Sequence, residues 1–280
     1  MKLEIYTVPF KNQIIYKMKK VLYLFVLSAV IYSCGQKDIS KTYVARPLTV
    51  TEKFNESAEP GDTALKIVKY AGNGKEEAGK ELFSIKYKDT LVTIKLSETD
   101  TSAGTAKLAF ASFVNTQKTA ALVQIADESG LTAPFFIVAL KDGKLDVSSL
   151  YRASIGAKDS EYTKGLTKIG RNGYLINNDF FVANVNAKVY VLKRQNPDER
   201  IQGEFMTNSP DKTTLVFLTP ATSSIYQVNY VSNQSLDQKL SKEANADAYR
   251  HVQKSFTWQA NSGGVYFFKP DKVVDISSFK

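Results

Sequence analysis

The chain has 280 residues, 43% of them hydrophobic and 23% charged, and a formal net charge of +9. This length and hydrophobic fraction are enough for one large domain or two small ones with buried cores. The basic residues are spread along the chain and form no arginine-rich run, which argues against a nucleic-acid partner. Residues 1–33 hold five lysines and one glutamate, so the rest of the chain carries only +5.

Residues 18–34 have the pattern of a secretory signal. Lys19 and Lys20 precede an apolar run that continues to Ser33 and Cys34. The run is shorter than the roughly 20 apolar residues that a transmembrane helix needs, so we expect residues 18–33 to be removed. Pro9 interrupts any helix in residues 1–17, and we interpret that stretch as an extension upstream of a true start at residue 18.

The sequence Ile31-Tyr32-Ser33-Cys34 resembles the lipobox of Gram-negative bacterial lipoproteins. The resemblance implies cleavage between Ser33 and Cys34, and diacylglycerol and palmitate-type acyl chains on Cys34. It also explains why an exported chain keeps a single cysteine. Several acyl chains, at about 0.8 kcal/mol per buried methylene, predict a stable membrane anchor. Gly35 follows the cysteine where aspartate would mark inner-membrane retention, which favours the outer membrane and leaves the periplasmic side or the cell surface open.

The remaining chain divides into a short N-terminal segment and a β-rich body. Residues 34–62 are mixed in composition and predict a polar tether, with one strand within residues 42–50. Residues 63–280 predict a β-rich body, either one domain or two that divide near residues 155–175. No family is indicated for this body.

Consecutive alternating runs in the body predict antiparallel hairpins. The Asp142-Gly143 step is a strong turn signal, because glycine accepts positive φ. The expected strand pairs are residues 82–87 with 90–96, 107–114 with 119–126, and 134–140 with 145–150; four further runs follow at 188–194, 200–207, 214–219 and 224–230, and a last hairpin at 264–268 with 272–276. Short connections between such runs predict an antiparallel meander folded as a two-sheet β-sandwich. Four segments with a common strand-turn-strand rhythm leave a small degenerate β-propeller as the alternative, although their spacing is uneven.

One helix is predicted, at residues 235–250 near the C-terminal end. Ser235 and Gln238 have the spacing of a capping box, and Leu236 and Leu240 begin an apolar stripe that recurs every four residues. We expect the stripe to pack on a sheet. The alternative is that Leu236 and Leu240 contact a partner protein.

Motifs for catalysis, cofactors or metals are absent from the sequence. Residues 74–81 match a phosphate-binding loop only in part, because Glu81 replaces the hydroxyl residue that would hold Mg²⁺. The single histidine, His251, has no second histidine or free thiol to complete a metal site or a triad. We therefore expect no enzyme activity, no cofactor and no metal.

Aromatic residues offer one candidate binding feature. Trp258, together with tyrosines 151, 162, 174, 226 and 230, could form a platform on which sugar rings stack. In β proteins such residues more often belong to the core or to cross-strand pairs. The candidate interaction residues are thus Leu236, Leu240 and Trp258.

These observations together favour a cell-envelope lipoprotein with a non-enzymatic binding or scaffolding role. The expected contacts are the membrane, through the lipid, and an envelope protein or glycan. Two alternatives remain: a structural subunit of an envelope-spanning secretion or surface assembly, and a carbohydrate-active enzyme that uses paired carboxylates.

Overall fold

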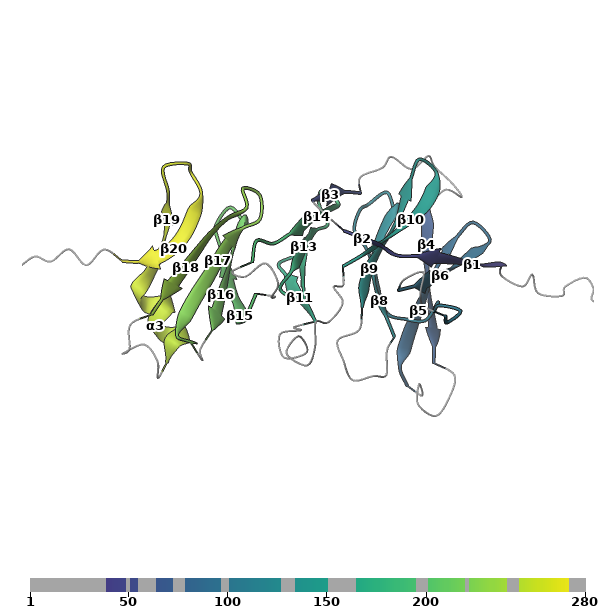
Figure 1. Cartoon of the computed structure of the whole chain (residues 1–280), viewed down its shortest axis with the longest axis horizontal. Helices are drawn as coiled ribbons and strands as arrows, with labels where there is room; N and C mark the ends of the chain where they lie inside the picture. The colour runs from purple at the N-terminus through teal and green to yellow at the C-terminus, as the bar shows by residue number, and fades with distance from the viewer. Residues whose placement is uncertain are drawn as a thin grey trace, which may run out of the picture. The chain divides into compact units, whose positions relative to one another are not determined.

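The computed structural model describes residues 39–48, 51–54, 64–72, 79–96, 101–126, 134–150, 165–194, 201–219, 222–240 and 247–271 (Figure 1). These residues form four sheets of mainly antiparallel strands and one helix near the C-terminal end. The predicted fold class is therefore confirmed. The predicted signal, including Ser33 and Cys34, lies outside the described residues.

The first sheet nearly closes on itself. Its nine strands are β1 (Ile39–Val44), β2 (Arg46–Pro47), β4 (Leu65–Ala71), β5 (Glu81–Tyr87), β6 (Thr90–Lys95), β7 (Leu108–Phe113), β8 (Ala120–Ile125), β9 (Phe135–Lys141) and β10 (Lys144–Ser149). Strand β1 lies beside β6 at one edge of the sheet, whereas β2 pairs in parallel with β10 at the other. Because only Ala45 separates β1 from β2, one short segment connects both edges.

The hairpins predicted in the first sheet are all present. Strand β5 pairs with β6, β7 with β8, and β9 with β10. At the turn between β9 and β10, Asp142 and Gly143 both have positive φ, of 50° and 68°. That combination is the two-residue turn whose twist matches that of the flanking strands, as the Asp-Gly step predicted.

Two smaller meanders follow. The second sheet contains β11 (Leu166–Ile169), β12 (Gly173–Ile176), β13 (Phe180–Ala183), β14 (Lys188–Val191) and, at its edge, β3 (Glu52–Lys53); the third contains β15 (Glu204–Asn208), β16 (Thr214–Thr219), β17 (Ser224–Asn229) and β18 (Gln234–Lys239). The four strands β11–β14 and the four strands β15–β18 each have the antiparallel order of a propeller blade. The nine-stranded first sheet does not have this form.

The second sheet packs against the first sheet through one hydrophobic cluster and against the third sheet through another. In β12, Ile176 belongs to a cluster with Leu122 of the first sheet, whereas Leu175 belongs to a cluster with Phe217 of the third. Successive strand residues point to opposite faces, so the second sheet is apolar on both. This explains why all four residues of β12 are buried.

The predicted helix at residues 235–250 is wrong in its position. The structure has strand β18 at 234–239, paired along its length with β17, and a helix, α3, at Ala248–Ser255. Asp247 caps this helix, since its side chain accepts a hydrogen bond from the Arg250 N–H at 3.2 Å. A spacing of four fits both periods, because residues four apart also share one face of a strand. Leu236 and Leu240 are thus not on a helix.

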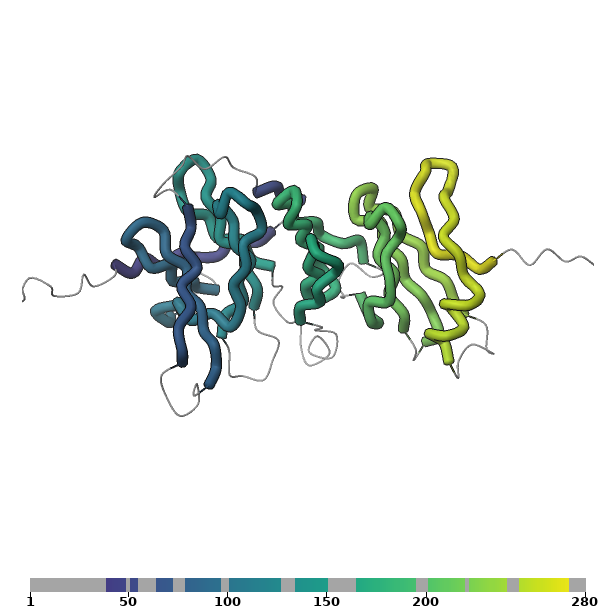
Figure 2. The backbone as a smooth tube through the Cα atoms, turned by 180° about the vertical axis from the view of Figure 1, so that it is seen from behind, coloured from purple at the N-terminus to yellow at the C-terminus, as the bar shows by residue number. Residues whose placement is uncertain are grey.

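Two other boundaries differ from the prediction. In the last hairpin, β20 (Tyr266–Pro270) pairs with the preceding β19 (Phe256–Ala260), which follows α3 directly (Figure 2); residues 272–276 lie outside the described residues. Residues 39–54, assigned to the tether, contribute β1, β2 and β3 to two sheets. Strands this short depend on partners about 50 to 140 residues away, which local patterns do not reveal.

An ion-pair network holds this N-terminal segment in place. The Arg46 guanidinium donates to both Glu52 carboxylate oxygens at 2.7 Å and to Asp146 of β10 at 2.7 to 3.2 Å. Lys141 contacts the same two carboxylates at 3.0 and 3.2 Å. Two cations thus alternate with two anions where β2, β3 and the β9–β10 hairpin meet.

Candidate functional site

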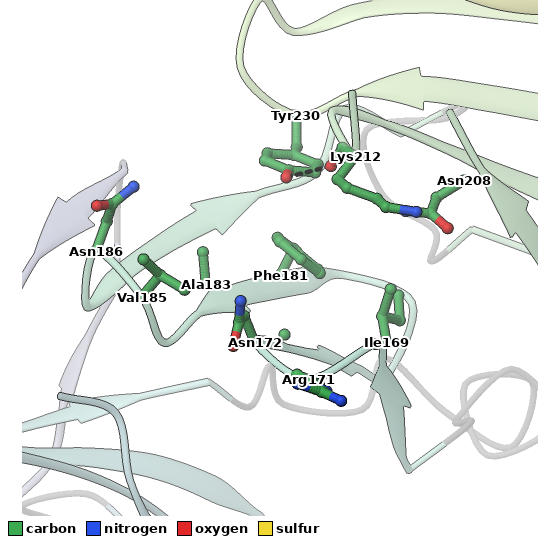
Figure 3. A pocket seen from close by; sticks show the side chains of 12 residues that line it. Ile169, Arg171, Asn172, Phe181, Ala183, Val185, Asn186, Asn208, Lys212 and Tyr230 are labelled. Carbon is green, nitrogen blue, oxygen red and sulfur yellow. Dashed lines mark hydrogen bonds between the residues drawn. The ribbon is translucent and has the colours of Figure 1, made fainter. Parts of the chain in front are cut away.

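A cavity of about 300 Å³ opens where turns of the second and third sheets meet. The second sheet contributes the turn between β11 and β12, and the turn between β13 and β14. The third sheet contributes the turn between β15 and β16, and Tyr230 immediately after β17. Figure 3 shows Arg171 and Asn172 on one side of this cavity and Lys212 and Asn208 on the other. We call it the first cavity.

Two stacked aromatic rings form one wall of the first cavity. The ring centroids of Phe181 and Tyr230 lie 4.4 Å apart with an interplanar angle of 29°, and Tyr190 packs behind Tyr230 at 4.8 Å. Gly173 allows this arrangement, because a Cβ atom there would lie 2.6 Å from the edge of the Phe181 ring. The position of the Phe181 ring in this wall therefore depends on the absence of a side chain at Gly173 of β12.

The turn between β15 and β16 positions the third-sheet side of the cavity. Ser209 Oγ accepts hydrogen bonds from the N–H groups of Thr213 and Thr214 at 3.1 and 2.9 Å, and the Ser209 hydroxyl donates to Asp211. Within this turn Lys212 adopts a positive φ of 65°. Its carbonyl accepts a hydrogen bond from the Tyr230 hydroxyl, so the turn fixes both the lysine and the aromatic wall.

The Tyr230 hydroxyl remains protonated at physiological pH. Burial, assisted by the neighbouring Tyr190 and the Asp211 charge, raises the pKa of Tyr230 to about 12. Burial would also raise the pKa of the Asp211 carboxyl, but hydrogen bonds from Ser209 and Thr213 outweigh it and lower that pKa. The Asp211 carboxylate thus accepts hydrogen bonds from Ser209 and Thr213 of the same turn.

The rim of the first cavity carries positive charge and amides. Arg171 and Lys212 are exposed, and neither forms an ion pair within the described part of the chain. Asn172, Asn186 and Asn208 add amides that can both donate and accept hydrogen bonds. The described lining residues include no aspartate or glutamate.

This combination suits recognition of a polar ligand with an anionic group. An aromatic side chain can contact the apolar face of a ring in the ligand, and amides can bind the hydroxyls of the ligand. Exposed cations can form charge-assisted hydrogen bonds with its anionic group. The described lining holds neither a cysteine, serine or histidine nucleophile nor a carboxylate. No group of three or more potential metal ligands occurs in the described ranges.

The predicted interaction residues lie elsewhere. Leu236 is half-buried on edge strand β18, and Leu240 packs at the margin of the cluster that connects the third sheet with α3. Trp258 packs in the same cluster, with its ring 5.0 Å from that of Phe268. None of the three lines the first cavity.

The tyrosines of the predicted platform are also separated. Tyr174 packs edge-on against Phe110, and the Tyr226 hydroxyl donates to the Lys193 carbonyl at 2.6 Å. Only Tyr230 of the described members lines the cavity, while residues 151 and 162 lie outside the described ranges. His251 lies within α3 with its ring 6.2 Å from that of Phe256, away from the cavity.

Arg171, Phe181 and Lys212 were not predicted as site residues from the sequence. The Asn-Ser-Pro-Asp-Lys-Thr segment at residues 208–213 signals a turn, and the glycines at 170 and 173 signal another. Neither signal says that the two turns, some 40 residues apart, face the same space.

Comparison with known proteins gives no family for this chain. No protein-family model matches the sequence, and no curated protein matches it. Within the described residues, no helix has the length and apolar character needed to cross a bilayer.

Proposed function

We propose that this chain is a lipid-anchored protein of the bacterial outer membrane. In this proposal it binds, without chemical change, a saccharide that carries a negatively charged group. The lipobox-like residues 31–34 support the anchor through Cys34. The first cavity supports the ligand class.

The observation that carries the proposal is an aromatic wall beside two cations that form no ion pair in the described part of the chain. A sugar ring has apolar C–H faces that pack on the partly exposed Tyr230 ring, which the buried Phe181 ring supports, and equatorial hydroxyls that reach the rim amides. Arg171 and Lys212 favour a carboxylate or a phosphate on that sugar. The described lining lacks the two carboxylates of a glycosidase, which favours binding over hydrolysis.

The test uses the full-length, lipidated protein in detergent and three related sugars. Affinities for glucuronic acid, glucose 6-phosphate and glucose are measured by titration calorimetry or ligand-observed NMR. At least one charged sugar should bind tenfold or more tighter than glucose, because a charge-assisted hydrogen bond contributes about 1.5 to 3 kcal/mol. The preferred charged sugar decides between carboxylate and phosphate.

Matched variants connect this affinity to the first cavity. Arg171→Gln and Lys212→Gln should each weaken binding of the charged sugar. Lys168→Gln removes an exposed charge on β11 that does not line the cavity, and it should leave binding unchanged. Equal affinity for glucose and both charged sugars, or no binding of any, would show that the proposed ligand class is wrong.

A further inference from the structure

A second cavity adjoins the first and shares part of its wall. Its volume is about 370 Å³, and it lies between the β7–β8 turn of the first sheet and the same two turns of the second sheet. Asn172 and Val185 line both cavities. Val185 is 66% exposed, so it lies between the two openings rather than in the core.

The dividing element, which we call the rib, is the turn at residues 184–187. The start of the rib is hydrogen-bonded to the β11–β12 turn, since the Asn184 N–H donates to the Asn172 carbonyl at 2.7 Å. Its end is bonded to the segment after β3, since the Phe54 N–H donates to the Ala187 carbonyl at 2.6 Å. The rib is therefore held from both sides and can act as a fixed support for a ligand.

The second cavity differs from the first in charge. Its described lining contains no charged residue and presents Asn115, Thr116, Asn172 and Asn184 as polar groups. Asn115 is already committed, because its amide donates to the Phe54 carbonyl at 3.0 Å and its oxygen accepts from two backbone N–H groups of the β7–β8 turn. Asn184 Oδ1 is shielded from solvent and receives no hydrogen bond within the described structure.

We infer that the ligand is an oligosaccharide of at least two units that crosses the rib. Its acidic unit lies in the first cavity and a neutral unit lies in the second, with the linkage over Val185. Because Asn184 Oδ1 is shielded from solvent, the hydroxyls of the neutral unit bind instead to the exposed Thr116 and Asn172. This inference rests on the proposed function, because it extends the same site.

Two joined sites predict a dependence on ligand length. When two units are linked, binding of the second is intramolecular, and affinity rises without any new contact in the first site. The full-length protein is therefore titrated with glucuronic acid, with N-acetylglucosamine, and with the disaccharide that joins them. The disaccharide should bind roughly tenfold or more tighter than glucuronic acid.

A pair of variants at neighbouring exposed positions locates this gain. Thr116→Trp fills the second cavity and should reduce the gain to less than about twofold, while the affinity for glucuronic acid stays unchanged. Gln117→Trp places the same ring at an exposed position that lines neither cavity, and it should leave the gain intact.

The outcomes separate the inference from the proposed function. Equal affinities for glucuronic acid and the disaccharide, or a gain that survives Thr116→Trp, would overturn the second subsite and leave the first cavity as a saccharide site. A tetraglutamate peptide that binds more tightly than the disaccharide would show that the two cavities accept an acidic polypeptide, against the inference. Failure of every sugar to bind would overturn the proposed function itself.

Discussion

The ion pair between Asp179 and Arg194 should contribute strongly to the stability of the second sheet. Only 1% of the Asp179 side chain and 7% of the Arg194 side chain are exposed. Arg194 Nε donates to Asp179 Oδ1 at 2.9 Å, and its Nη2 donates to the second carboxylate oxygen. Asp179 directly precedes β13, the strand that carries Phe181 into the cavity wall.

Arg194→Met should lower the free energy of unfolding by about 3 to 5 kcal/mol. That is the usual cost of removing one partner from a buried ion pair, because the remaining charge stays desolvated. At about 2 to 4 °C per kcal/mol for a chain of this size, the melting temperature should fall by roughly 6 to 20 °C. Urea unfolding followed by circular dichroism and a thermal melt measure the two quantities.

The double variant Asp179→Leu/Arg194→Met is the control for this reasoning. Replacing both charges with apolar side chains of similar volume is often nearly neutral, so the double variant should be more stable than Arg194→Met alone. If Arg194→Met costs less than about 1 kcal/mol, the pair does not carry the buried charge that its geometry indicates.

Three further results are expected. Burial opposes the low pKa of Asp146, but hydrogen bonds from Arg46 and Lys141 outweigh it, and hydrogen bonds from Arg46 lower the pKa of Glu52. Both carboxyls therefore stabilise the fold above their unfolded pKa, and this stability is lost as the pH falls through the lowered folded pKa values. Arg46→Gln should reduce the dependence of the melting temperature on pH in this acid range. An unchanged pH dependence would contradict the network. Gln227 is fully buried; its amide donates to the Phe268 carbonyl at 2.7 Å and its oxygen accepts from the Phe268 N–H at 2.6 Å. Gln227→Leu should therefore lower the free energy of unfolding in urea by at least about 2 kcal/mol. A smaller loss would mean that the last hairpin docks mainly through its apolar contacts. Cys34→Ser should abolish metabolic labelling with a palmitate analogue, and retained labelling would refute Cys34 as the lipidated residue.

Local sequence patterns determined the elements whose physics is local. Alternation of apolar residues and the Asp142-Gly143 turn specified strands and hairpins of the first sheet, because a strand has a period of two and a tight turn needs positive φ. The same patterns misplaced the helix, since the spacing of Leu236 and Leu240 fits both a helix and a strand. Pairing with β17 decided between them.

The candidate site could not be predicted from local patterns. Arg171 and Lys212 are ordinary exposed cations on separate turns, and Phe181 is one of many strand aromatics. What brings them together is the burial of both faces of the second sheet against two different neighbours. The sequence by itself determined the β class and the Asp142-Gly143 turn, and it predicts the secretory signal at residues 18–34. The tertiary structure alone decided which turns share a cavity, because that depends on contacts between residues far apart in the chain.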